Sequence, residues 1–191
     1  WYAFAGNPAR TPSGGTAAPA TATPPTTRGV EPERLAGVDR YATAAQISLA
    51  GFGSGVPVAY VATGTNFPDA LAAGAAATHQ GGPVLLVTSG SVPSATATAL
   101  GQLKPAVIKV VGGTSIIGNG VVELLRPYAT SGRVDRVAGA NRYATAAEIS
   151  RQAFAPSVPV AYVATGTNFP DALAGVAAAG SGGGPVLLTK P

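Results

Sequence analysis

The feature that most constrains this chain is an internal repeat with an offset of 102 residues, since matching segments begin at residues 34 and 136. The two copies align without insertion or deletion. This period exceeds the roughly 20–50 residues of solenoid and propeller repeats and is the size of a small domain. Segments 34–45, 56–72 and 82–86 of the first copy match segments 136–147, 158–174 and 184–188 of the second.

The repeat predicts one complete module at 34–135 and a truncated second module at 136–191. Residues 9–33 are rich in Pro, Thr and Ala and hold few large apolar side chains, so we expect a disordered, flexible linker there. Residues 1–8 are interpreted as the tail of an upstream domain. The chain contains no methionine, so we expect it to be a processed or truncated piece of a longer protein.

Within one module, apolar runs of strand length alternate with Ala-rich segments of helical spacing. This alternation predicts an α/β fold, with Rossmann- or flavodoxin-like parallel-sheet modules in tandem after the linker. The expected helices are 41–52, 68–79, 94–103 and 116–128, and the expected strands are 58–62, 84–88, 107–111 and 133–137.

Composition and motifs exclude several classes of function. The chain has no cysteine, which removes disulfides, thiol catalysis and thiolate metal sites. The segment 112–118 follows an expected strand but has neither the glycine spacing of a dinucleotide-binding loop nor the lysine of a P-loop. We therefore expect no cofactor. No cluster of His, Asp or Glu suggests a metal site.

Charge and hydropathy limit the partners. Charged residues make up 10% of the chain, and the net charge is +4, which favours anionic partners weakly. No dense basic stripe with interleaved aromatic residues is present, so nucleic acid is not an expected partner. The Ala-rich run at 70–77 is far shorter than the roughly 20 residues of a membrane span.

A turn of identical sequence follows the first expected strand of each copy. Asn66 is interpreted as a helix N-cap, with Asp69 as the acidic end of a capping box and Pro68 in the first turn. Capping does not explain Phe67. Because loops at the carboxyl ends of parallel strands often bind ligands, this turn is also a candidate binding site. Its counterparts in the second copy are Asn168, Phe169 and Asp171.

Repeated arginines and tyrosines form the other candidate site. Guanidinium groups suit recognition of phosphate or carboxylate, and a neighbouring aromatic ring can stack on a sugar. The alternative is a structural role, in which the arginines fasten the module boundary through backbone carbonyls or Asp39. The residues are Arg34, Arg40 and Tyr41 in the first copy, and Arg136, Arg142 and Tyr143 in the second.

Catalysis is not expected. The chain has a single histidine, His79, and its counterpart in the second copy is Ser181. A Ser-His-Asp arrangement would therefore occur at most once, and no nucleophile motif flanks it. Repeated paired carboxylates for glycoside hydrolysis are not evident either.

Several linked motifs, each present in the first copy at consistent spacing, resemble cell wall binding repeat 2. These are RLAGVDRYATA from residue 34, VATGTNFPDALA from residue 61, GPVLL from residue 82 and VVGGT from residue 110. The resemblance implies Rossmann-like modules, typically three in tandem around a pseudo-threefold axis. It also implies non-covalent anchoring of exported proteins to anionic polymers of the Gram-positive wall.

The resemblance therefore predicts a secreted, non-catalytic module of the cell wall or cell surface. The expected partners are an anionic wall polymer, of the teichoic-acid type or another secondary polymer, and further repeats of the same family. Two alternatives stay open: a fragment of a wall hydrolase or peptidase whose catalytic domain lies upstream, and a structural self-assembly module. The polymer-binding candidates are the twelve residues of the two sites: Arg34, Arg40, Tyr41, Asn66, Phe67, Asp69, Arg136, Arg142, Tyr143, Asn168, Phe169 and Asp171.

The second copy ends soon after its second expected strand. Without the rest of the module, its apolar strands would leave an open edge and an uncovered sheet face. We therefore expect residues after about 140 to be marginally stable unless they pack on the first copy or on a continuation of the chain.

Overall fold

The computed structural model of the chain describes residues 34–190. The expected upstream tail (1–8) and linker (9–33) lie outside the described residues. Residues 35–190 lie in one compact unit. Within that unit the expected alternation of strands and helices is present, and all strand pairs are parallel. The α/β, parallel-sheet prediction is confirmed.

The first copy builds a four-stranded parallel sheet in the order β2-β1-β3-β4, the flavodoxin-like arrangement. Tyr60 lies opposite Val84 on one side and Lys109 on the other, and Lys109 lies opposite Asp135. The strands are β1 (Val58–Thr63), β2 (Val84–Val87), β3 (Val107–Val111) and β4 (Arg133–Val137).

Helices cover both faces of this sheet because side chains alternate along each buried strand. Ala59 and Val61 of β1 face a core shared with three helices, whereas Val58 and Tyr60 face a core formed with α2. The three helices on the first face are α1 (Arg40–Gly51), α3 (Ser94–Leu103) and α4 (Asn119–Leu125), and α2 is Pro68–His79. A short 3-10 turn, η1 (Arg126–Tyr128), follows α4.

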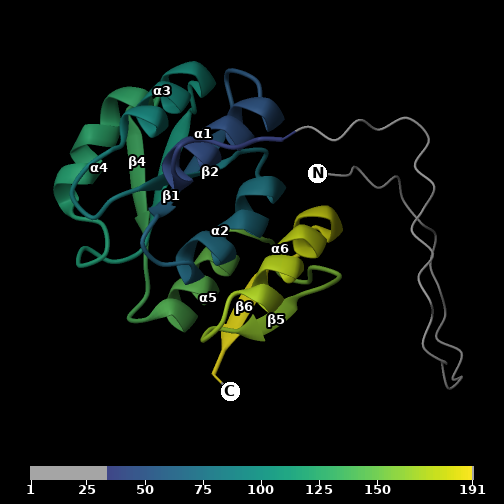
Figure 1. Cartoon of the computed structure of the whole chain (residues 1–191). Helices are drawn as coiled ribbons and strands as arrows, with labels where there is room; N and C mark the ends of the chain where they lie inside the picture. Colours follow the sequence, from purple (N-terminus) through teal and green to yellow (C-terminus); the bar gives the residue numbers. More distant parts are fainter. Residues whose placement is uncertain (1–33, 191) are drawn as a thin grey trace, which may run out of the picture. The chain divides into compact units, whose positions relative to one another are not determined.

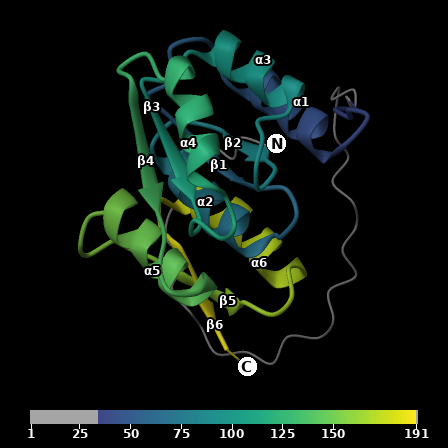
Figure 2. The same ribbon diagram turned by 90° about the vertical axis from the view of Figure 1, so that its left-hand side faces the viewer.

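The second copy adds a two-stranded parallel sheet and two helices, which pack on α2 of the first copy (Figures 1 and 2). Gly74 of α2 lies against Val176, and Thr78 lies against Gly180, so small residues let α2 and α6 approach closely. One continuous core therefore joins the two copies. Its second-copy elements are α5 (Arg142–Ala153), β5 (Tyr162–Thr165), α6 (Pro170–Gly182) and β6 (Val186–Thr189).

The repeated Gly-Pro-Val-Leu-Leu segment has a steric explanation. Gly82 lies directly against the carbonyl group of Val58, and Gly184 lies against that of Val160 in the same way. A side chain at either position would collide with backbone rather than with a movable side chain. This contact fixes where the second strand of each copy begins, since Tyr60 N–H donates to Pro83 O and Tyr162 N–H donates to Pro185 O.

One helix boundary differs from the sequence-based expectations. The helix expected over 116–128 begins only at Asn119, because residues 113–118 form a turn in which Ile116 N–H and Ile117 N–H donate to Gly113 O. The expected strand 133–137 forms in full and completes the first sheet. The sequence boundary at 135/136 thus cuts through β4, and Arg136 lies on a strand of the first sheet.

Candidate functional site

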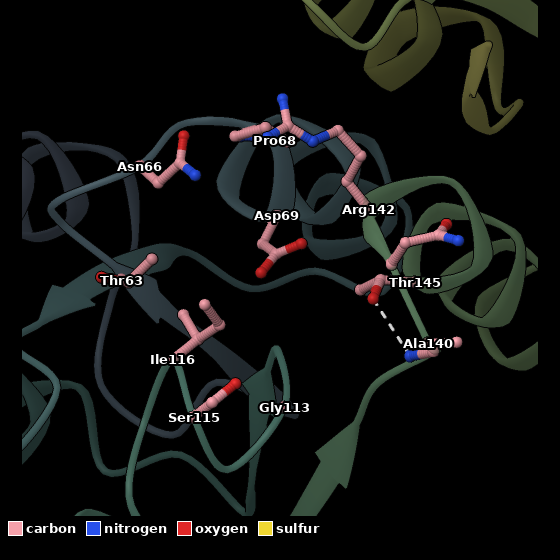
Figure 3. A pocket seen from close by; sticks show the side chains of 12 residues that line it. Thr63, Asn66, Pro68, Asp69, Gly113, Ser115, Ile116, Ala140, Arg142 and Thr145 are labelled. Atoms are coloured by element: carbon pink, nitrogen blue, oxygen red, sulfur yellow. Dashed lines mark hydrogen bonds between the residues drawn. The ribbon is translucent and has the colours of Figure 1, made fainter. Parts of the chain in front are cut away.

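A pocket of about 210 Å³ lies at the carboxyl ends of the strands in the first sheet (Figure 3). It sits where β1 and β3 end, between helices that leave on opposite faces, which is the usual ligand position in open α/β sheets. The start of α5 closes its side, so both copies contribute to it. The lining residues are Thr63, Asn66, Pro68, Asp69, Gly113, Ser115, Ile116, Gly139, Ala140, Asn141, Arg142 and Thr145.

Asp69 is the acidic residue of this pocket. It lies in the first turn of α2, and Figure 3 shows its carboxylate in the middle of the lining residues. Gly112, with φ of +112°, allows this position, because a methyl group there would lie 2.8 Å from Asp69 Oδ2. Burial raises the pKa of Asp69 above its usual 3.8, while the positive charge of Arg142 acts in the opposite direction.

The capping-box interpretation of this turn is wrong. The N-cap of α2 is Phe67, which makes no side-chain cap hydrogen bond. Asn66 instead accepts a hydrogen bond from the adjacent Phe67 N–H at 3.0 Å through Oδ1, and Asn168 does the same with Phe169. Pro68 occupies the first helical position as expected. Because the helix begins at Pro68, its N-cap position is Phe67 and not Asn66. Asp69 therefore has no part in a capping box.

Arg142 brings the second copy to the rim of the pocket. Its Nη1 donates to Gly166 O at 2.6 Å, and Arg40 Nη1 makes the equivalent bond to Gly64 O at 2.5 Å. Figure 3 shows the Arg142 side chain running along the rim toward Pro68. The repeated arginine therefore fastens the end of the first strand within its own copy, and its guanidinium is held beside the pocket.

Arg136 and Arg34 are placed differently. Arg136 Nη1 donates to Gly112 O at 2.7 Å, and its Nη2 donates to Asn119 Oδ1 at 3.2 Å. These bonds fasten β4 to the loop after β3 by a backbone carbonyl, the structural role weighed for the arginines. Arg34 is exposed. Neither residue lines the pocket.

The repeated tyrosines pack on glycines. A methyl group at Gly64 would lie 2.5 Å from the Tyr41 ring, and one at Gly166 would lie 2.6 Å from the Tyr143 ring. Both rings are half-buried. Their position supports the strand end that Arg40 or Arg142 holds, and they do not line the pocket.

Phe67 and Phe169 meet where the two copies join. Their ring centroids are 5.6 Å apart at an interplanar angle of 60°, a favourable tilted arrangement. Phe169 remains 50% exposed. Asn168 and Asp171 are also exposed, and no α5-like helix faces them within residues 34–190. The structure thus brings Asn66, Asp69 and Arg142 together and leaves their second-copy counterparts apart.

Several pocket residues were missed by the sequence reasoning. Asn141 caps α5 by accepting hydrogen bonds from Tyr143 N–H and Ala144 N–H at 3.0 Å, and Asp39 caps α1. Thr145 Oγ1 accepts from Gly139 N–H at 3.0 Å and shapes the adjoining turn. A cap signal was available, since Asp39 and Asn141 each precede an Ala-rich helix. Ser115 and Ile116 lie in a loop that had been considered only for nucleotides.

His79 lies away from the pocket. Its ring stacks on Phe154 of the second copy, with centroids 4.6 Å apart. Among residues 34–190 there is no group of three potential metal ligands, and no helix there has the length and hydropathy to cross a membrane.

Comparison with known proteins gives a family match. The model of Cell wall binding domain 2 matches residues 34–122 and 136–191. These two stretches follow the two copies of the sequence repeat.

Related proteins match over most of this chain. It is 31% identical over 158 residues to N-acetylmuramoyl-L-alanine amidase LytC of Bacillus subtilis (strain 168), covering 83% of this chain and 31% of that protein. It is 33% identical over 158 residues to the amidase enhancer of the same organism, covering 83% of this chain and 22% of that protein. This chain thus spans less than a third of either relative.

Two solved structures share the fold. Cwp6 from Clostridium difficile superposes with a TM-score of 0.73 at 24% identity, over 86% of this chain and 27% of that chain. Cwp8 from Clostridium difficile gives a TM-score of 0.70 at 30% identity, over 82% of this chain and 27% of that chain.

Proposed function

We propose, from the premise that this chain belongs to the cell wall binding domain 2 family, that it holds a longer, exported protein on the cell wall by binding an anionic wall polymer. The chain is a cell-wall-binding module, and its place is the cell wall or cell surface. Non-covalent anchoring, export and the anionic nature of the polymer are the parts that we infer.

The observation that carries the proposal is the meeting of two copies at one pocket. Asn66 and Asp69 come from the first copy, and Arg142 comes from the second. Arg142 uses Nη1 to hold Gly166 O, and Nε and Nη2 make no hydrogen bond within residues 34–190. Those nitrogens can donate to a phosphate or carboxylate of a polymer that passes the rim.

Further copies of the same repeat are proposed as packing partners. Ile149 of α5 is 2% exposed under α2, whereas its counterpart Ile47 of α1 is 39% exposed. In the same way Asp69 faces Arg142, whereas Asp171 and Arg40 are both exposed. A third copy between α6 and α1 would cover these surfaces and complete two more pockets, which supports a pseudo-threefold arrangement.

A catalytic role for this chain is not part of the proposal. The histidine of the chain stacks on Phe154 outside the pocket, and the matched family is a binding domain. The likeness to LytC supports the alternative that the longer protein is a wall hydrolase, with its catalytic domain elsewhere. A self-assembly module is the other alternative, and it predicts oligomers of the purified chain without wall material.

The proposal is tested by sedimenting the chain with purified Gram-positive walls, before and after extraction of their anionic polymers. Wild-type protein should sediment with intact walls, and binding should fall after extraction and at high salt, because charge interactions are screened. Arg142→Gln removes the charge and keeps a shorter polar side chain, and it should weaken binding by roughly tenfold, about 1.4 kcal/mol.

The matched control is Arg151→Gln on the same helix. Arg151 is exposed and paired with Glu148, outside the pocket. It should bind walls as the wild type does. Equal binding to extracted and intact walls, or equal losses in the two variants, would contradict the proposal.

A further inference from the structure

The pocket holds a carboxylate that no donor satisfies among residues 34–190. Asp69 accepts no hydrogen bond and forms no ion pair there, although its carboxylate lies among the lining residues (Figure 3). Partial burial raises its pKa, and the positive charge of Arg142 lowers it by less. No fully buried side-chain oxygen among the described residues lacks a partner, so the carboxylate faces solvent, and a ligand hydroxyl can replace water on it.

An anionic group is a poor occupant for the same reason. A phosphate or carboxylate placed beside Asp69 would set two negative charges together in a site of lowered dielectric. Arg142 offsets only part of this repulsion, because its charge lowers the pKa of Asp69 by less than burial raises it, and one of its nitrogens is already bound to Gly166 O. The positive group lies at the rim of the pocket, and the negative group lies among the lining residues.

The other lining groups suit hydroxyl groups and a ring. Asn66 uses Oδ1 on Phe67 N–H, which leaves its amide N–H groups as donors. Ser115 is exposed and can donate or accept. Pro68 and Ile116 supply an apolar wall, and Ile116 is 37% exposed toward solvent. Carbohydrate and polyol residues combine hydroxyl groups with C–H faces in this way.

The volume of the pocket favours one residue of a polymer as occupant. About 210 Å³ lies below the roughly 300–1,000 Å³ of pockets that take drug-sized ligands, so it suits one sugar ring or one short polyol.

We propose that the pocket binds one neutral, hydroxyl-bearing residue of the wall polymer, with the Asp69 carboxylate accepting hydrogen bonds from its hydroxyl groups, while the polymer's anionic groups lie at the rim beside Arg142. This inference takes the identity of the polymer from the proposed function, whereas the chemistry of the pocket is argued from its lining residues alone. The recognised chemistry is a pair of neighbouring hydroxyl groups, whether on a sugar ring or on a polyol.

The test is a titration of the full chain, followed through backbone amide resonances of the pocket loop 112–116. The probes are N-acetylglucosamine, ribitol, inorganic phosphate and methylammonium. N-acetylglucosamine, ribitol or both should shift these resonances, and the probe that does so distinguishes a sugar from a polyol.

The variants test the role of Asp69. Asp69→Ala should weaken that binding by roughly tenfold, about 1.4 kcal/mol. Asp69→Asn should weaken it less, because the amide oxygen still accepts a hydrogen bond. Glu123→Ala removes an exposed carboxylate paired with Arg126 on α4, and it should change nothing.

The pH dependence gives an independent readout. Because the ligand is bound by the carboxylate form, affinity for the neutral probe should be highest above the raised pKa of Asp69 and fall as the pH is lowered through it. The Asp69→Asn variant should lose this pH dependence. The charged group that acts on Asp69 is Arg142.

Three results would overturn the inference. The first is that methylammonium shifts the resonances of 112–116 and the neutral probes do not, and the second is that phosphate shifts them with the same affinity in the wild type and in Asp69→Ala. The third is that no probe shifts these resonances. Each is separable from failure of the proposed function. Wild-type protein that binds walls but ignores neutral probes refutes this inference alone. Protein that binds a neutral probe but no wall refutes the anchoring proposal alone.

Discussion

Gly64 and Gly166 end the first strand of each copy, and each lies under a tyrosine ring while its carbonyl accepts a bond from an arginine. In each copy, consecutive Arg and Tyr residues at the start of one helix thus contact the same glycine. This arrangement explains why Arg, Tyr and Gly recur together at the same offset. At the residue scale, the main role of the repeated motif is to fix the end of the first strand of each copy. The Arg142 guanidinium lies beside the pocket because it is held at that strand end.

The packing of the Tyr41 ring on Gly64 predicts that a larger residue at position 64 destabilises the fold. Gly64→Ala places a methyl group 2.5 Å from the Tyr41 ring and should lower the free energy of unfolding by about 1–3 kcal/mol, the usual cost of overpacking. Gly101→Ala in α3 is the control, because no atom lies within 4 Å of the added group. It should raise stability by about 0.5–1 kcal/mol. Urea denaturation measures both, and a neutral Gly64→Ala would refute the packing argument.

Helix α2 is the element on which the two copies depend. It covers the first sheet, and its other sides receive α5 and α6. Half of its twelve residues are alanines, and Ala73, Ala75 and Ala76 are fully buried. A helix of small side chains can be approached from several sides, which large side chains would prevent. The Ala-rich composition therefore serves packing between copies as much as helix propensity.

The repeat supplies a matched pair of substitutions at this scale. Ile149→Ala removes a side chain buried between α5 and α2 and should cost about 2–4 kcal/mol, the range for a core cavity. Ile47→Ala, at the equivalent and partly exposed position of α1, should cost less than about 1 kcal/mol in the same denaturation experiment. Equal losses would mean that α5 does not dock on α2 as described.

At the scale of the whole molecule, the second copy is supported on one side and open on another. Val163 of β5 is 67% exposed, whereas Val61, at the equivalent place in β1, is fully buried. β1 pairs with two strands and β5 with one. The expected open edge and uncovered face are therefore present among residues 34–190, while α2 covers the opposite side of the second copy.

Hydrogen exchange on the full chain measures what this asymmetry does to stability. Amides of 160–164 should exchange much faster than those of the identical segment 58–62, because fewer contacts oppose local opening. Docking on α2 should still slow the exchange in α6 relative to β5. Equal protection of the two segments would contradict the expectation that the second copy is the weaker part.

The sequence by itself determined the repeat, the order of strands and helices, the α/β class and the identity of the strand-end turns. These follow from local patterns, since apolar runs, glycines and prolines act over a few residues. It also pointed to Asp69 and Arg142, although as members of two separate motifs. It misplaced the cap of α2 and the start of α4, because helix ends depend on small differences between neighbouring residues.

Only the tertiary structure decided which of two identical sequences is a fully buried strand of six residues and which is a partly exposed strand of four. Residues 58–63 and 160–165 have the same amino acids, so their difference comes entirely from their neighbours. The same holds for the pocket, where Asp69 meets Arg142 while the identical Asp171 stays exposed. A site formed between two copies requires both copies to be placed, and local sequence carries no information on that placement because burial and pairing are set by contacts distant along the chain.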